Sequence, residues 1–375
     1  MLVRSAPNRR RWPVIVALLV VGLAVLWTAA WFIAAGRVEE TVNGWKAREA
    51  QSGRVYACAS EAYGGYPFGI HMRCEEPSAR LTSLKPSMAA DAQTLLVQAW
   101  LWQPTVLTAA LAGPLTVEAP GQGAPIVGRW TQAGIAVHGL PQEPRQVDVA
   151  LEEPAFVQSV DPKGRLLFQA ERLNVRGTML EGSARASPVI QVSANVTGAT
   201  APALHPAAVL PVDGELLAVL RGLKDFAPKP WAERFRELQA AGGRIQIKSA
   251  RLAQGESIAI AQGELGLSAN GRLDGQIEVT VTGLEKLLNT LGLDGALPKG
   301  ANNQMNAAFG ALDRLAPGLG RFARNNAGSM VTMGLAFIGK PTQLEGRRAV
   351  TVPLRFSDGA VSLGPLKLGD VPALY

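Results

Sequence analysis

Histidine and acidic side chains are the groups in this sequence that could carry out acid–base chemistry. The three histidines, His71, His138 and His205, lie far apart in the chain and in unrelated contexts. Glu75-Glu76 and Glu152-Glu153 are acid pairs of the kind that a glycosidase needs. Adjacent residues on a strand point to opposite faces, however, so neither pair aims two carboxylates at one bond. We therefore expect all of these side chains to be structural or solvated.

The sequence lacks the common motifs of hydrolases and nucleotide-binding proteins. It contains no Gly-x-Ser-x-Gly elbow, no Ser-x-x-Lys and no His-Glu-x-x-His, and no Gly-x-Gly-x-x-Gly opens a helix. Basic residues are not interleaved with aromatic ones, as they are on many nucleic-acid-binding surfaces. We therefore expect a protein that is not an enzyme, uses no cofactor and binds no nucleic acid.

The two cysteines, Cys58 and Cys74, could bind a metal, carry out redox chemistry or form a disulfide. A metal site needs more ligands than the nearby His71 supplies, and a redox pair is more usually spaced Cys-x-x-Cys. In an oxidising compartment an isolated pair is most simply a structural disulfide. We therefore expect a disulfide between Cys58 and Cys74 and no bound metal.

The segments that contain the cysteines predict how this disulfide forms. Val55–Ala59 and Ile70–Cys74 both have the pattern of short strands, with a glycine-rich loop between them. Folding the chain back about Tyr66 places position 58 opposite position 74. The sequence therefore predicts two paired strands that the disulfide links directly.

Three tryptophans are candidates for an apolar binding surface. Trp100 and Trp102 share one face of the run 95–102, and Trp130 follows on a nearby predicted strand. Aromatic side chains line ligand sites, but they also fill protein cores. We expect core residues, and the alternative is an apolar ligand face formed by Trp100, Trp102 and Trp130.

An apolar run at 12–36, with no ionisable residue, is the strongest element signal. At about 1.5 Å per residue it reaches roughly 30 Å or more, which is enough to cross a bilayer. Trp27 and Trp31 lie toward its far end, where tryptophans prefer the headgroup boundary. A cleaved secretory signal is the alternative, but its apolar stretch would be shorter. We expect an uncleaved transmembrane helix.

The charges around this helix predict its orientation. Four arginines and no acid precede it, so the positive-inside rule places the basic tail 1–11 in the cytoplasm. These arginines account for most of the net charge of +7, and the remainder of the 375-residue chain is close to neutral. We therefore expect a single-pass protein of the inner membrane, with a stalk at 37–54 and a periplasmic body at 55–375, whose halves would meet near 200–240.

Alternating apolar and polar residues predict strands throughout the body. The clearest runs centre on Val149, Ile247, Val279 and Val352, and turn residues such as Asp358-Gly359 separate them. Period-two alternation is typical of antiparallel sheets with one buried face. Helices are a minority and are expected at three places, namely from Pro230 to Gly242, from Leu284 to Leu291 and from Asn302 to Leu315.

The segment Cys58…Gly65-Tyr66-Pro67-Phe68-Gly69…Cys74 follows a membrane span and precedes a long β-rich region. The chain closes with Leu354-Arg355-Phe356-Ser357-Asp358-Gly359 and Leu363-Gly364-Pro365. This order resembles the bacterial domain-of-unknown-function family numbered twenty-one twenty-five over essentially the whole chain. The family is described as membrane-associated, so the resemblance implies the topology and implies no activity. The strand pattern is also similar to that of envelope proteins whose long curved sheets handle lipids, a likeness of fold alone.

These observations together predict an α+β protein in which a transmembrane helix precedes a mainly antiparallel, exported body with a few short amphipathic helices. We expect a non-catalytic cell-envelope protein that binds an apolar ligand such as lipid, or another envelope protein. The alternative is a periplasmic enzyme that acts on envelope material. An apolar-lined sheet would favour binding, and a polar cluster in a deep cleft would favour the enzyme.

Overall fold

The computed structural model describes residues 12–84, 86–121, 123–159, 164–204, 206–227, 229–283, 339–363 and 366–375. The chain divides into two compact units, unit 1 up to Gln122 and unit 2 from Gly123 onward. The basic tail 1–11, His205, Gly364-Pro365 and the helices expected at 284–291 and 302–315 lie outside the described residues.

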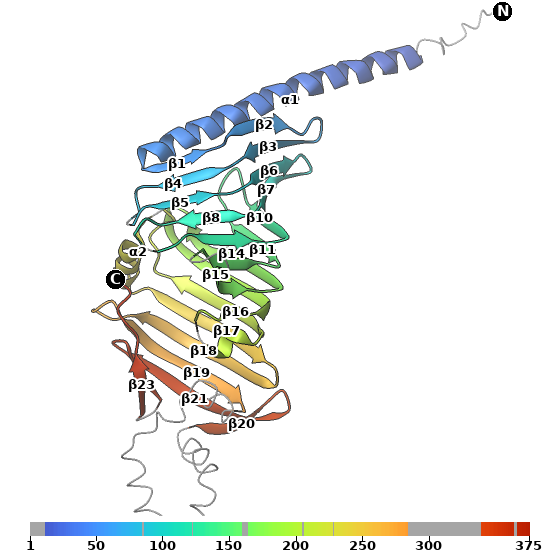
Figure 1. Cartoon of the computed structure of the whole chain (residues 1–375). Coiled ribbons are helices and arrows are strands. Elements are labelled where there is room, and N and C mark those ends of the chain that lie inside the picture. The colour runs from blue at the N-terminus through green and yellow to red at the C-terminus, as the bar shows by residue number, and fades with distance from the viewer. Residues whose placement is uncertain are drawn as a thin grey trace, which may run out of the picture. The chain divides into compact units, whose positions relative to one another are not determined.

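Unit 1 begins with one long helix and continues as short strands (Figure 1). Its elements are α1 (Trp12–Gln51), β1 (Arg54–Ala57), β2 (Ser60–Gly64), β3 (Gly69–Glu75), β4 (Ser78–Leu81), β5 (Met88–Asp91), β6 (Thr94–Trp100), β7 (Gln103–Ala112) and β8 (Leu115–Glu118). The strands form two antiparallel arrays, β1-β4-β5-β8 and β2-β3-β6-β7. The chain passes between the arrays after β1, β3, β5 and β7, so both grow together along the sequence.

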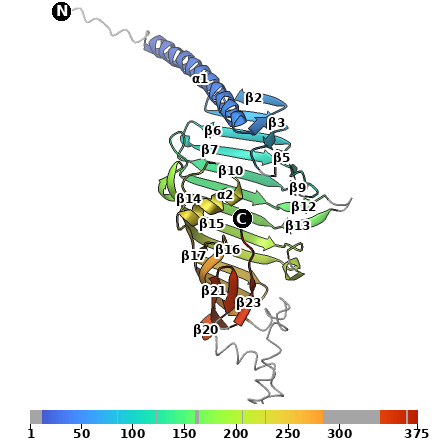
Figure 2. The same cartoon turned by 90° about the vertical axis from the view of Figure 1, so that its left-hand side faces the viewer.

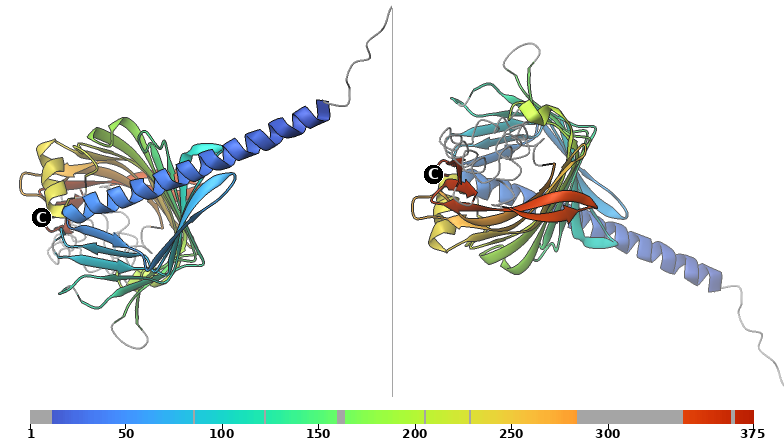
Figure 3. Two further views of the ribbon diagram at one scale, coloured as in Figure 1. Left: turned by 90° about the horizontal axis from the view of Figure 1, so that it is seen from above. Right: turned by 90° about the horizontal axis from the view of Figure 1, so that it is seen from below.

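Helix α1 continues without a break through the residues expected to form the membrane span and the stalk. Its residues from Trp12 to Trp27 are all exposed. From Thr28 onward, half-buried residues recur every three or four positions, at 28, 31, 35, 38, 42, 46 and 49, with Gly44 in addition. This spacing places them on one helix face. That face lies across β1 and β2, the first strands of the two arrays (Figures 1 and 3).

Cys58 and Cys74 form the expected disulfide, with sulfur atoms 2.01 Å apart and Cα atoms 5.4 Å apart. The strand pairing predicted around it is wrong. β1 pairs with β4, and β3 pairs with β2, in which Glu61 lies opposite Cys74. Cys58 lies in the short segment between β1 and β2, where the chain passes from one array to the other. The disulfide links this segment to β3. The sequence of β2, Ser-Glu-Ala-Tyr-Gly, has no apolar alternation that would have indicated a strand.

Unit 2 is also mostly antiparallel sheet. Its elements are β9 (Ile126–Arg129), β10 (Gln132–His138), β11 (Gln146–Glu152), β12 (Ala155–Gln158), β13 (Arg165–Gln169), β14 (Arg172–Ser183), β15 (Ala186–Ala199), the 3-10 turn Pro206–Val209, β16 (Val212–Arg221), α2 (Trp231–Ala240), β17 (Arg244–Gln254), β18 (Ser257–Leu267), β19 (Leu273–Thr282), β20 (Lys340–Leu344), β21 (Arg347–Ser357), β22 (Ala360–Leu363) and β23 (Leu366–Asp370). β9, β12 and β13 form one array. β10, β11 and the strands from β14 to β23 form another, in which β20 joins β21.

The strands expected around Val149, Ile247, Val279 and Val352 are confirmed as β11, β17, β19 and β21. Asp358-Gly359 forms the tight turn between β21 and β22, with positive φ at both residues, as a two-residue hairpin of this type requires (red strands in Figure 3).

The helix expected after Pro230 is confirmed as α2, which contacts β18 and buries Leu238 (Figure 2). With the apolar helix α1 ahead of a mostly antiparallel body, the expected fold class is confirmed.

Candidate functional site

Unit 1 contains an apolar cavity of about 240 Å³, which we call the inner cavity. It lies under helix α1 and between the two strand arrays, where a core would otherwise be packed. Side chains from all three parts line it, among them Val42, Trp45, Tyr56, Met72, Ala90 and Leu95. Trp45 stacks on Tyr56, with ring centroids 4.9 Å apart, and so closes the helix side of the lining. The inner cavity can therefore accept an apolar group but offers few hydrogen-bond partners.

The disulfide borders the inner cavity, since both Cys58 and Cys74 line it. Cys74 is 1% exposed and is among the most buried side chains that the structure describes. The ammonium group of Lys46, at the rim, pairs with the carboxylate of Glu61. The lining is therefore fixed by a covalent link to β3 and by an ion pair between α1 and β2, which belongs to the same array as β3.

A second apolar cavity, of about 350 Å³, lies along α1 toward its N-terminus, and we call it the end cavity. On the helix side it is lined by Trp27, Ala30, Trp31 and Ala34, and on the sheet side by Gly69, Ile70, Ala99, Trp100, Leu101 and Pro104. Together with Val42 and Trp45 of the inner cavity, these helix residues follow one helical stripe. The helical spacing of Val38 and Val42, continued toward the N-terminus, predicts this stripe. Trp27 and Trp31 belong to it as well as to the expected membrane span.

The Gly65-Tyr66-Pro67-Phe68-Gly69 segment is the loop between β2 and β3, and it docks on α1 at the end cavity. The indole N–H of Trp27 donates to the Pro67 carbonyl at 3.1 Å, and that of Trp31 donates to the Gly69 carbonyl at 2.8 Å. The hydroxyls of Thr28 and Tyr66 lie 2.8 Å apart. Three hydrogen bonds therefore hold this loop against three neighbouring residues of the helix.

Trp100 and Trp102 lie at the tip of the hairpin that joins β6 to β7. Trp100 ends β6, Trp102 lies in the turn, and their rings stack with centroids 4.8 Å apart. Trp100 is 37% exposed and Trp102 is 63% exposed, so the expectation that they are core residues is wrong. Gly69 allows the close approach of Trp100, since a Cβ at Gly69 would lie 3.1 Å from the Trp100 ring.

Trp130 lies in unit 2, between β9 and β10 rather than on a strand, and is half-buried. Its ring passes close to Gly128, where a Cβ would also meet Phe156 of β12. Phe156 in turn packs against Phe168, with ring centroids 6.2 Å apart. The end cavity has Trp100 in its lining, and Trp130 belongs to this separate aromatic group of unit 2.

His138 of β10 lies beside a carboxylate, with its Nε2 3.1 Å from the carboxylate of Asp148. Arg176 and Gln146 also donate hydrogen bonds to Asp148. Burial alone would raise the pKa of Asp148, but these hydrogen bonds outweigh it and lower that pKa. A carboxylate held ionised in this way ties three neighbouring strands together and is poorly suited to accept a proton near neutral pH.

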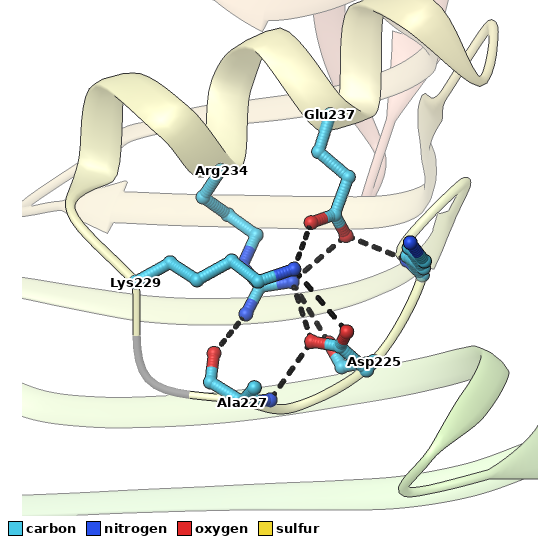
Figure 4. A network of polar contacts seen from close by, with 6 residues as sticks. Asp225, Ala227, Lys229, Arg234 and Glu237 are labelled. Atoms are coloured by element: carbon cyan, nitrogen blue, oxygen red, sulfur yellow. Dashed lines mark hydrogen bonds and ion pairs between the residues drawn. The ribbon is translucent and has the colours of Figure 1, made fainter. Parts of the chain in front are cut away.

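A second polar cluster joins α2 to the segment before it (Figure 4). Lys229 bonds Glu237 at 2.6 Å and Asp225 at 3.2 Å, and Arg234 bonds Glu237 at 2.8 Å. Their side chains are all 20% exposed or less. Each charge has an opposite partner, so the cluster secures the helix and leaves no group poised for chemistry. Among the described residues, no three His, Cys, Asp or Glu side chains gather as a metal site would require.

Comparison with known proteins gives one family. The model of the family described as "uncharacterized protein conserved in bacteria (DUF2125)" matches residues 31–372. No curated protein and no solved structure matches the chain. The match runs from the part of α1 that docks on the sheets to the residues after β23, and so takes in the inner cavity, the disulfide and all of the end-cavity lining except Trp27 and Ala30. The resemblance carried by Gly65–Gly69 and its flanking cysteines is thus confirmed, and the chain belongs to the DUF2125 family of bacterial proteins.

Proposed function

We propose that this protein is a non-catalytic, membrane-anchored protein of the bacterial cell envelope that holds a lipid acyl chain in its inner cavity. The observation that carries the proposal is the inner cavity itself, an apolar space of about 240 Å³ inside unit 1. Protein interiors are normally packed without such spaces. An acyl chain would fill this space and remove its apolar lining from water.

The composition of the lining favours an acyl chain over a polar ligand. Each buried methylene contributes about 0.8 kcal/mol, so ten of them supply roughly 8 kcal/mol before ordering costs are subtracted. Such affinity needs no charged contact. The ion pair of Lys46 with Glu61 at the rim already satisfies the nearest charge.

Helix α1 supplies the anchor in this proposal, because it is long and apolar enough to cross a membrane. The four arginines before it would keep the N-terminus in the cytoplasm and place the sheets in the periplasm. An oxidising periplasm also suits the disulfide between Cys58 and Cys74. The inner cavity would then stand beside the membrane that holds its ligand.

Adjacent alanines of β5 allow a matched test. Ala90 lines the inner cavity, and Ala89 points to the opposite face of the same strand. The full-length chain, purified in detergent, is examined by native mass spectrometry for bound lipid. We expect lipid adducts on the wild type and on Ala89→Phe, and a loss of most of them in Ala90→Phe, whose ring fills the cavity. Equal lipid on Ala89→Phe and Ala90→Phe would contradict the proposal, and a folded wild type without lipid would favour an envelope protein as the partner.

A further inference from the structure

The position of the end cavity along α1 has a consequence for the membrane. The hydrocarbon core of a bilayer is about 30 Å thick and takes about 20 helical residues to cross. The exposed part of α1, from Trp12 to Trp27, measures only about 24 Å at 1.5 Å per residue. Part of the crossing must therefore be made by residues from Thr28 onward, which already lie beside the sheets.

The loop from Gly65 to Gly69 is held at this level of the helix. Hydrogen bonds from Trp27, Thr28 and Trp31 hold the loop against the turns of α1 that complete the crossing of the bilayer. The ring of Tyr66 also packs edge-on against Trp31, with centroids 5.6 Å apart. The loop thus cannot avoid the membrane boundary without breaking these bonds.

The side chains at this end of unit 1 suit that boundary. Tyr66, Phe68, Leu101 and Trp102 are each more than half exposed, and the Phe68 and Trp102 rings lie 6.4 Å apart. An exposed aromatic cluster of this kind is unusual on a surface that faces water alone. The segments 64–70 and 99–107 contain no Asp, Glu, Lys, Arg or His, so neither would bury a charge in lipid. Tryptophan and tyrosine favour the headgroup level of a bilayer.

We propose that the tips of the β2–β3 and β6–β7 hairpins immerse in the outer leaflet of the bilayer that α1 crosses. Unit 1 is then held to the membrane at two places, by the helix and by this aromatic tip. The end cavity, which lies between α1 and the same hairpins, opens into the acyl region of that leaflet. The inference rests on the proposed anchoring by α1 and is independent of what occupies the inner cavity.

The depth of labelled cysteines tests this inference, because the native cysteines are joined in the disulfide and do not take a label. The full-length chain carrying Trp102→Cys is labelled with the fluorophore NBD and reconstituted into phosphatidylcholine vesicles. Some vesicles contain lipid with a nitroxide near the headgroup end of the acyl chain. Met88→Cys is the matched control, since Met88 is also exposed but lies on β5. It pairs there with Leu81, which pairs with Arg54, three residues after the C-terminal end of α1. Leu18→Cys, in the exposed part of α1, reports on the anchor.

We expect the nitroxide lipid to quench most of the fluorescence at position 102 and none at position 88. Quenching of position 102 by an aqueous quencher alone, with position 18 shielded in lipid, would overturn the inference and leave the anchoring intact. Aqueous quenching at position 18 as well would show that α1 does not cross the bilayer, and would overturn both.

Discussion

At the scale of single residues, Cys74 connects the stability of unit 1 to its inner cavity. It is 1% exposed, it lines the cavity, and through Cys58 it fixes the corner where the chain passes from β1 to β2. Without the disulfide this corner would be held by the few backbone hydrogen bonds of two short strands. Loss of the disulfide would therefore affect both the fold of unit 1 and the shape of the cavity wall.

Replacing Cys58 by alanine should lower the free energy of unfolding by about 2–5 kcal/mol, the range for a native disulfide. In the wild type, alkylation followed by mass measurement should modify neither cysteine until a reductant is added. The double variant Cys58→Ala/Cys74→Ala is the control, because it removes the disulfide without leaving a free thiol. Alkylation of unreduced protein from its native envelope would disprove the claim.

The sequence predicted the partners of the disulfide but not its surroundings, and the reason is physical. Two cysteines leave one pairing within the chain, whereas the register of the strands around them depends on β2, whose polar residues carry no strand signal. The exposure of Trp100 and Trp102 could not be predicted for a related reason. Alternation tells which residues share a face, but it cannot tell whether another element covers that face. In unit 1 the covering element is α1, which shares the end cavity with Trp100 but not with Trp102.

At the scale of elements, α2 depends on its ion cluster as much as on its single buried residue, Leu238. Burial alone would raise the pKa of Glu237, but hydrogen bonds from Lys229 and from the Lys224 N–H lower it below its ordinary value. A carboxyl with a lowered pKa contributes stability that is complete above its unfolded pKa. That stability is lost as the pH falls through the lowered value.

Acidification below the ordinary pKa of glutamate, about 4.3, should therefore loosen α2. We expect the thermal midpoint of the wild type to fall over this range more steeply than that of Glu237→Gln, which has already lost the charge. Glu233→Gln, on an exposed position in the first turn of the same helix, should follow the wild type. Circular dichroism against temperature at several pH values gives the comparison. Identical acid dependence in wild type and Glu237→Gln would refute the role of the cluster.

The elements themselves were largely predictable. β11, β17, β19 and β21 each contain a run of alternating apolar and polar residues, the pattern typical of antiparallel strands. The short strands β4, β5 and β8 hold only four residues each, too few for alternation to be recognised. They nevertheless form part of the inner cavity wall, through Ser78, Ala79, Ala90 and Leu115. The sequence alone therefore does not predict the cavity, because these strands are too short to show a pattern.

At the scale of the whole molecule, the proposed orientation of the chain in the membrane rests on α1 and the arginines before it. A reporter that is active only in the periplasm, fused after Tyr375, should be active. The protein should also stay in the membrane fraction after a carbonate wash, because an apolar helix of this length is not released by removing charge contacts. Recovery of the chain in the soluble fraction would mean that the N-terminal segment is a cleaved signal.

The central claim is that the inner cavity holds an acyl chain in the living cell, and a photo-crosslinker placed in its wall tests this most directly. Benzoylphenylalanine is introduced in place of Leu95, which lines the cavity, and in a second variant in place of Leu96, which points to the opposite face of β6. After irradiation of intact bacteria, the protein is purified and its adducts are weighed. A lipid adduct at position 95 and none at position 96 is the predicted result. A protein adduct at position 95, or equal lipid adducts at both positions, would contradict the account.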